Sequence, residues 1–210
     1  MYNYTDRIVV FVDILGFKNI VFSSISDYKN LQKIEKALKL IQQTAEELKT
    51  YKSEELDTEV CFFTDSFVLS WIDKGNDSFF YILSQIIYLQ QNFILNNLLL
   101  RGGIAKGNLI HKGSVIYGPA LIKAVELEGK QAKYPRIIIE PCVIESLPNV
   151  KYDKEFNMNL LKKDSNDNYY YTDFIGQCDD LDYQYEFLLF INKMQETIKY
   201  GLKMILIIKL

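Results

Sequence analysis

Two aspartates stand where short apolar strands are expected to end. Asp13 follows the apolar residues 9–12 in the stretch FVDILGF, and Asp65 lies in FFTDSF. Taken alone, each of them has the usual role of such a residue, a cap or a turn. Taken together at one sheet edge, two uncompensated carboxylates repel each other and lose hydration. A divalent cation removes both penalties, so the pair predicts a metal site.

The residues around the pair indicate which metal and which ligand would fit. Oxygen donors without a nearby histidine favour Mg²⁺ or Mn²⁺ over zinc. We expect the one histidine, His111, at a surface or in a hairpin. Gly16 leads into an expected helix over residues 17–24. The free N–H groups and dipole of a helix start favour phosphate. The arrangement describes a nucleoside triphosphate site, with Lys18 either reaching a phosphate or solvated.

The hydrophobic pattern places both aspartates in one sheet. Apolar runs predict strands over residues 7–13, 60–63, 67–71, 98–105, 109–116 and 135–140 and helices over 26–50, 78–97 and 119–129. This order approximates the split βαβ arrangement, a ferredoxin-like or palm-like antiparallel sheet covered by helices, of the α+β class. The first strand and the first hairpin are then neighbours, which brings Asp13 and Asp65 together.

The chain changes character after residue 148. The turn signal DSNDN separates two runs, 160–163 and 169–174, which predict a peripheral hairpin. Residues 183–210 predict a terminal helix. We expect residues 1–148 to form a catalytic domain and residues 149–210 to form an extension packed on it.

Composition limits the partners and the compartment. The net charge of −3 offers no basic field for a nucleic-acid polymer. Three scattered cysteines give no disulfide framework or zinc spacing, so we expect a reducing cytoplasm. Glutamines interrupt the apolar stretch 79–100, and the apolar tail 204–210 is too short to span a bilayer. We therefore expect no membrane partner.

Four motifs in order resemble the class III nucleotidyl cyclases. FVDILGF resembles the metal motif F-x-D-I-x-G-F, and FFTDSFVLSW stands where the second metal aspartate falls. LLRGGIAKG resembles R-x-G-I-x-x-G, and GPALIKAVELE matches G-D-A-V-N-x-A-x-R-L-E at its Gly, two Ala, Leu and Glu. The resemblance covers residues 7–130. It implies a phosphorus–oxygen lyase that converts a nucleoside triphosphate to a 3′,5′-cyclic nucleotide and pyrophosphate.

The resemblance also implies a role for each site residue. Asp13 and Asp65 would hold two Mg²⁺ or Mn²⁺ ions, with the Ile14 carbonyl assisting one of them. The backbone around Gly16 and Phe17, beside Lys18, would hold the β- and γ-phosphates. The ribose 3′-oxygen would attack the α-phosphate in line. Sites of this family form between two chains, so the resemblance implies a homodimer with shared active sites.

The base-reading positions depart from the purine cyclases. Cys61 stands where a lysine reads adenine, and Val115 falls near its acidic partner. Cys61 alone is equally an ordinary small core residue. In its R-G-G-I motif and its Tyr134-Pro135-Arg136-Ile137 strand, the chain is similar to the bacterial Pycsar pyrimidine cyclases. That similarity implies cyclic CMP or cyclic UMP as product and a role in antiphage defence.

The transition-state positions depart as well. Ile122 aligns with the family's asparagine and Glu126 with its arginine, so another cation must meet the developing charge. We expect Arg136, in a β-rich run, to pair with Glu128, Glu140 or a phosphate. The candidate cations are Arg101, Lys123 and Arg136.

Two other functions remain open from the sequence. A cyclase-like domain that has lost its chemistry and serves as a nucleotide-binding or interaction module would explain Ile122 and Glu126. The retained pair Asp13 and Asp65 favours an enzyme, because a degenerate domain has no physical reason to keep two apolar-flanked carboxylates. A different nucleotidyl transferase with a palm-like sheet would also pair carboxylates in this way.

Overall fold

The first strand is the centre of the fold. β1 (Thr5–Ile14) pairs antiparallel with β3 (Ser66–Ile72) on one side and with β4 (Leu100–Lys112) on the other. Its middle residues are buried whichever face they point to, which explains the continuous apolar run in the sequence. This computed structural model describes residues 2–50, 53–74, 76–146 and 160–177.

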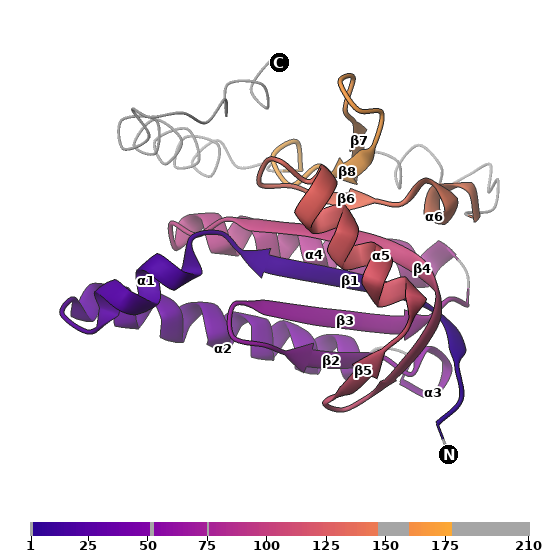
Figure 1. The fold of residues 1–210 in the computed structure, drawn as a ribbon, viewed down its shortest axis with the longest axis horizontal. Helices are drawn as coiled ribbons and strands as arrows, with labels where there is room; N and C mark the ends of the chain where they lie inside the picture. The colour runs from indigo at the N-terminus through magenta and orange to yellow at the C-terminus, as the bar shows by residue number, and fades with distance from the viewer. Residues whose placement is uncertain (1, 51–52, 75, 147–159, 178–210) are drawn as a thin grey trace.

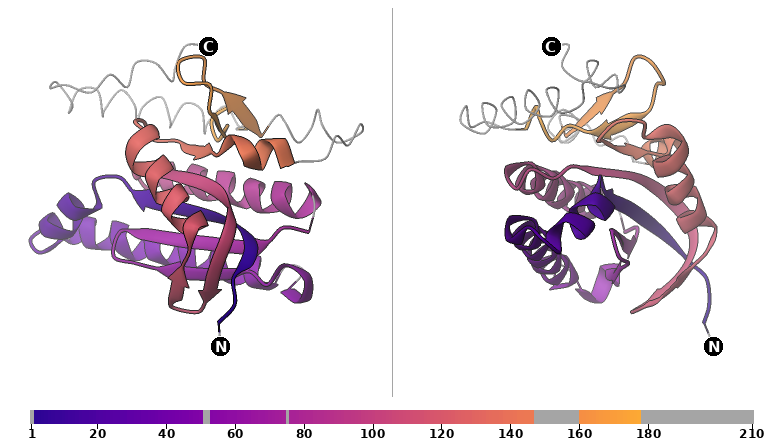
Figure 2. Two further views of the ribbon diagram at one scale, coloured as in Figure 1. Left: turned by 45° about the vertical axis from the view of Figure 1, so that its right-hand side comes forward. Right: turned by 60° about the vertical axis from the view of Figure 1, so that its left-hand side comes forward.

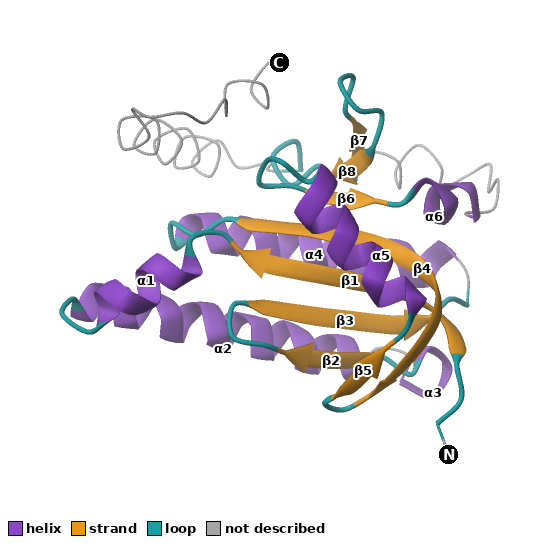
Figure 3. Cartoon of the chain, viewed as in Figure 1, coloured by secondary structure: helices purple, strands orange, loops and turns teal. Residues whose placement is uncertain are grey.

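The other strands extend this ladder to both edges. The order is β2-β3-β1-β4-β6-β8-β7, and β5 pairs with the far end of β4. The added strands are β2 (Glu59–Phe62), β5 (Val115–Tyr117), β6 (Ile137–Ile139), β7 (Leu161–Lys163) and β8 (Tyr170–Thr172). Of the ladders between described residues, only β4–β6 is parallel. The expected α+β fold with a mainly antiparallel sheet is confirmed (Figure 3).

Helices cover the two faces of the sheet unequally. α2 (Tyr28–Thr50) and α4 (Asn76–Leu95) lie together on one face, and α5 (Pro119–Glu126) crosses the other (Figures 1 and 2). The shorter helical segments are α1 (Phe17–Ser24), α3 (Ser53–Leu56), the π-helical turn η1 (Leu127–Gln131) and α6 (Pro141–Ser146). Ile8, Val10 and Val12 pack in the core on the α2–α4 side, whereas Val9 packs with α5. Because side chains alternate along a strand, Asp13 lies on the α5 face.

The strand β4 departs from the prediction of two strands over 98–105 and 109–116. It runs unbroken to Lys112, because Gly107, with φ of 147°, stays in the ladder opposite Arg7. The hairpin turn comes later, at Gly113. His111 therefore lies within a hairpin strand, as one alternative had it, but it is only 2 % exposed, so the surface alternative is wrong.

The hairpin β7–β8 is part of the main sheet. β8 pairs with β6, so the two strands predicted as peripheral extend the sheet by two positions. The expected terminal helix over 183–210 lies outside the described residues. In the described part of the chain, the helices are too short or too polar to cross a membrane.

Candidate active site

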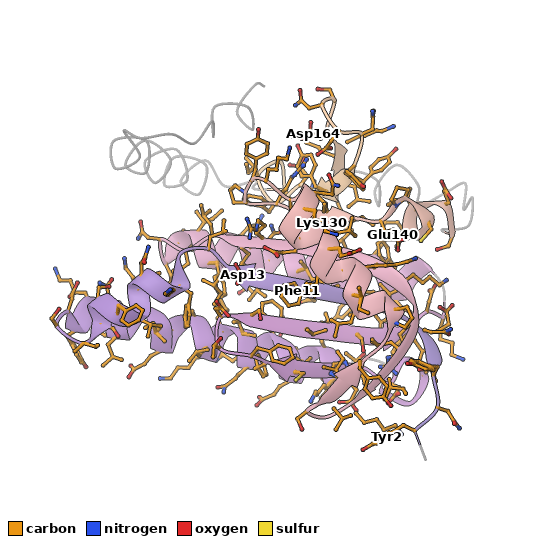
Figure 4. The ribbon with its side chains drawn as sticks, in the orientation of Figure 1. Tyr2, Phe11, Asp13, Lys130, Glu140 and Asp164 are labelled. Atoms are coloured by element: carbon orange, nitrogen blue, oxygen red, sulfur yellow. The ribbon has the colours of Figure 1, made fainter. Side chains whose placement is uncertain are left out.

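Asp13 and Asp65 lie at the same end of the sheet. Asp13 faces Ser66 in the β1–β3 ladder, and Asp65 is the preceding residue in the turn. The Ile14 N–H donates to the Asp65 carbonyl oxygen over 2.9 Å, which fixes this turn to the end of β1. Thr64 Oγ1 donates to Asp65 Oδ1 at 2.9 Å. Both aspartates are half-buried, and Asp13 appears beside Phe11 on the face that α5 crosses (Figure 4).

The electrostatic surroundings disfavour the charged form of Asp13. Burial raises the pKa of this carboxyl to about 6, and the negative charges of Glu128 and Asp65 add to the rise, whereas Arg101 opposes it. A carboxyl held at such a disadvantage in its ionised state is typical of functional sites. A bound cation would reverse the penalty.

The donor set suits a hard divalent ion. Within the described ranges, no three His, Cys, Asp or Glu side chains come together as a metal-binding group. Mg²⁺ does not need such a cage, because it usually keeps several waters and binds one or two carboxylates plus substrate phosphates. Asp13 and Asp65, with the nearby Ile14 carbonyl, fit that kind of site.

The start of α1 provides amides for an anion. Gly16 adopts a left-handed conformation, with φ of 75°, and turns the chain from β1 into the helix. The amides of Asn19 and Ile20 bond to the Gly16 carbonyl at 3.0 and 3.2 Å, so those of Phe17 and Lys18 remain at the helix start. The first turn carries no acidic residue. The Phe17 side chain is buried and anchors the helix, whereas Lys18 is exposed.

Arg101 is the candidate cation that shares the Asp13 row of the sheet. It is the β4 partner of Asp13 in the ladder. Its Nε and Nη2 both contact Oε1 of Glu128, which is 8 % exposed on η1. Glu128 was not among the predicted site residues. The signal for it was its place as the last matched position of the motif GPALIKAVELE.

Arg136 is engaged elsewhere. Its Nη1 donates to Asp164 at 2.6 Å and its Nη2 to Asp167, and the arginine is 2 % exposed. Both acids belong to the turn between β7 and β8, so of the expected partners of Arg136 the pairings with Glu128 and Glu140 are wrong. The guanidinium holds this hairpin to the segment before β6.

The remaining candidate cation lies on α5. Lys123 is half exposed and pairs with Glu140 at 2.9 Å. The Glu140 N–H bonds to the Ile104 carbonyl, three residues along β4 from Arg101. The structure therefore does not bring Lys123 into the row of Asp13.

The two positions that the sequence predicts to face the base, Cys61 and Val115, lie on segments that contact each other. Cys61 is buried in β2 opposite Val68, and burial raises the pKa of its thiol, which keeps it neutral. Val115 is 37 % exposed on β5. The Gly113 N–H donates to Glu59 Oε2 at 3.3 Å and joins the β4–β5 turn to the start of β2. Neither of the two positions carries a charged side chain.

Comparison with solved structures identifies the fold. No protein-family model and no curated protein sequence matches the chain. The adenylyl cyclase CyaB from P. aeruginosa matches with a TM-score of 0.53 and 14 % identity over 69 % of this chain and 81 % of that one. One structure of a bacterial light-regulated adenylyl cyclase matches with a TM-score of 0.53 and 15 % identity over 90 % of this chain and 99 % of that one. A second matches with a TM-score of 0.57 and 14 % identity over 94 % and 58 %. The chain thus has the class III nucleotidyl cyclase fold that its motifs predicted.

Proposed function

We propose that the chain is a metal-dependent nucleotidyl cyclase. The observation that carries the proposal is the pair Asp13 and Asp65, which this cyclase fold places at one end of the sheet. In the reaction, a bond forms between the ribose 3′-oxygen and the α-phosphorus, and the bond from that phosphorus to pyrophosphate breaks. The hydroxyl proton passes to water. Bound Mg²⁺ or Mn²⁺ would neutralise the phosphates and lower the pKa of the 3′-hydroxyl.

The described residues supply the remaining requirements. Asp13 and Asp65 hold the ions, with the Ile14 carbonyl beside them, and the amides of Phe17 and Lys18 receive the β- and γ-phosphates. Arg101 meets the phosphate charge, since it lies in the row of Asp13. All of these residues precede residue 148, which supports a catalytic unit over 1–148 with 149–210 as its extension.

The proposed substrate is a pyrimidine nucleoside triphosphate, UTP or CTP. The neutral thiol of Cys61 and the apolar Val115 offer nothing to read a purine edge, and the segments that carry them meet through Glu59 and Gly113. A smaller base would suit a site that lacks the purine-reading lysine and acid. The role in antiphage defence follows from the motif resemblance to the Pycsar cyclases.

A homodimer with shared sites is part of the proposal. Ile122 and Val125 are 61 % and 40 % exposed on α5, on the same face as Asp13. Exposed apolar side chains beside a site are typical of an interface. Sedimentation velocity tests the assembly: a dimer is expected, and its dissociation by Ile122→Glu would locate the interface on α5.

One observation favours a second candidate, a catalytically degenerate nucleotide-binding module. Ile122 cannot donate a hydrogen bond, and Glu126 is an exposed carboxylate paired with Lys130 at 2.8 Å. Neither supplies the transition-state contact of their family counterparts. Such a module would bind a nucleoside triphosphate and leave it intact.

Incubation with each of the four ribonucleoside triphosphates and Mn²⁺, followed by mass analysis, separates the two candidates. The cyclase predicts a cyclic monophosphate and pyrophosphate, from UTP or CTP alone if the pyrimidine assignment holds. A product from ATP or GTP would overturn only the base preference. Binding without product at high protein concentration would support the module.

A further inference from the structure

We propose that Glu128 is a positioning residue, which holds Arg101 beside Asp13 with the free edge of its guanidinium turned to the incoming triphosphate. The inference rests on the proposed function, because it assigns Arg101 a phosphate to meet. Glu128 itself would touch neither metal nor substrate. It acts through the arginine.

The backbone places Glu128 over Arg101. Gly103 lies on the α5 face of β4, and a Cβ there would stand 2.7 Å from Leu127 Cβ and would also meet the Ala124 carbonyl oxygen. The start of η1 therefore packs directly on the strand at Gly103. Arg101 is two residues away on the same face. The widened π-helical turn that begins at Leu127 brings the next residue, Glu128, onto that arginine.

The contact uses only one edge of the guanidinium. Arg101 Nε and Nη2 both meet Oε1 of Glu128. An arginine has five N–H groups, so the two on Nη1 and the second on Nη2 remain for another acceptor. No other described residue accepts a hydrogen bond from this guanidinium. The free edge matches the fork with which arginine binds phosphate.

The two side chains of this ion pair differ in their exposure to solvent. The Glu128 side chain is 10 % exposed and the Arg101 side chain 28 %. The carboxylate is thus the more buried partner, and the guanidinium remains partly open to solvent. An arginine fixed in this way loses less rotamer freedom when it binds an anion.

The test measures binding of inorganic tripolyphosphate by calorimetry in the presence of Mg²⁺. Glu128→Asp keeps the negative charge but shortens the side chain, so its contact with Arg101 is lost. The affinity for tripolyphosphate should then fall about tenfold. Glu126→Asp shortens the acidic side chain of the exposed Glu126–Lys130 ion pair by the same amount and should leave the affinity for tripolyphosphate unchanged. In an Arg101→Ala background, Glu128→Asp should have no further effect.

Each outcome decides the proposal. Unchanged affinity for Glu128→Asp, or an equal loss in the Arg101→Ala background, would overturn it, as would a wild-type protein that does not bind tripolyphosphate. If Glu128→Asp does not fold, Arg101→Lys is measured instead, because lysine keeps the positive charge but lacks the planar guanidinium edge that Glu128 contacts. It should also lose about tenfold, and wild-type affinity would contradict the proposal. Tripolyphosphate cannot be cyclised, so this binding measurement does not depend on whether the protein has cyclase activity.

Discussion

The N–H of Ile14 and the carbonyl oxygen of Asp65 are joined by a 2.9 Å hydrogen bond, which makes the end of β1 and the β2–β3 turn one unit. The two carboxylates are therefore brought together by the main chain and not by a contact of their own. Either side chain can be replaced without releasing this bond. Substitution at the pair therefore leaves this main-chain link in place.

Replacing Asp13 with Asn should stabilise the metal-free protein. The pKa of Asp13 is raised to about 6 from 3.8, so its ionisation costs more in the folded than in the unfolded chain. The stability contributed by the protonated Asp13 carboxyl is fully present below about pH 4 and is lost as the pH rises through about 6. At pH 7.5, Asp13→Asn removes this penalty, on the order of 1 kcal/mol for a half-exposed group.

Thermal unfolding without metal at pH 7.5 and at pH 4 measures the effect. The Tm of Asp13→Asn should exceed that of the wild type at pH 7.5 and match it at pH 4. Asp27→Asn is the control, because Asp27 is an exposed cap of α2 whose Oδ1 accepts from the Lys29 N–H, and Asn caps equally well. A lower Tm for Asp13→Asn at pH 7.5 would show that this carboxylate stabilises the fold.

His111 should make the protein sensitive to mild acid. Arg7 Nε donates to Ser70 Oγ at 3.0 Å, and Ser70 Oγ lies 2.8 Å from His111 Nδ1. The serine hydroxyl can accept from Arg7 with one lone pair and donate its hydrogen to Nδ1, an arrangement in which Nδ1 is unprotonated. Burial, and then the charge of Arg7, lower the pKa of His111 to about 4.

The sign of the His111 effect follows from this lowered pKa. Between pH 6.5 and about 4 the unfolded chain binds the proton and the folded chain does not, so stability falls as the pH falls, by up to about 1.4 kcal/mol per pH unit. Its contribution is fully present above pH 6.5. Urea unfolding at pH 7 and pH 5 should show a larger difference for the wild type than for His111→Gln. Equal differences would mean that His111 titrates normally.

Gly103 should tolerate no side chain. In Gly103→Ala the new methyl group meets Leu127 and the Ala124 carbonyl, so η1 must move from β4. We expect a loss of about 1–3 kcal/mol in the free energy of unfolding. Gly129→Ala is the matched control, since no atom lies within 4 Å of its Cβ, and Ala favours a helical segment by about 0.5–1 kcal/mol. Equal effects of the two changes would contradict the close packing at Gly103.

Arg136 should act on stability and not on catalysis. Arg136→Met leaves Asp164 and Asp167 without their buried cation, and we expect a loss of about 3 kcal/mol. Product formation per folded molecule should stay near the wild-type value. Normal stability with lost product would restore Arg136 as the transition-state cation, as the sequence allowed.

The sequence predicted what local patterns determine. The apolar run before Asp13 and the hairpin around Asp65 placed both residues, because strand ends and turns follow from neighbouring residues. The acids that bind Arg136 were missed, because Asp164 and Asp167 have a sufficient local explanation as turn residues. Glu128 was missed as a site residue for a related reason: a glycine at position 103 indicates a close backbone approach but not which segment makes it, and here that segment is the start of η1.

The most direct test of the metal-binding pair compares product formation by the wild type and Asp65→Ala with Mn²⁺ and the preferred triphosphate. The Ile14–Asp65 bond is main-chain, so the variant should keep its fold, as circular dichroism would show. We expect a cyclic nucleotide from the wild type and none from Asp65→Ala. Product from a folded Asp65→Ala at a rate near the wild type would contradict the assignment of Asp13 and Asp65 as the metal-binding pair.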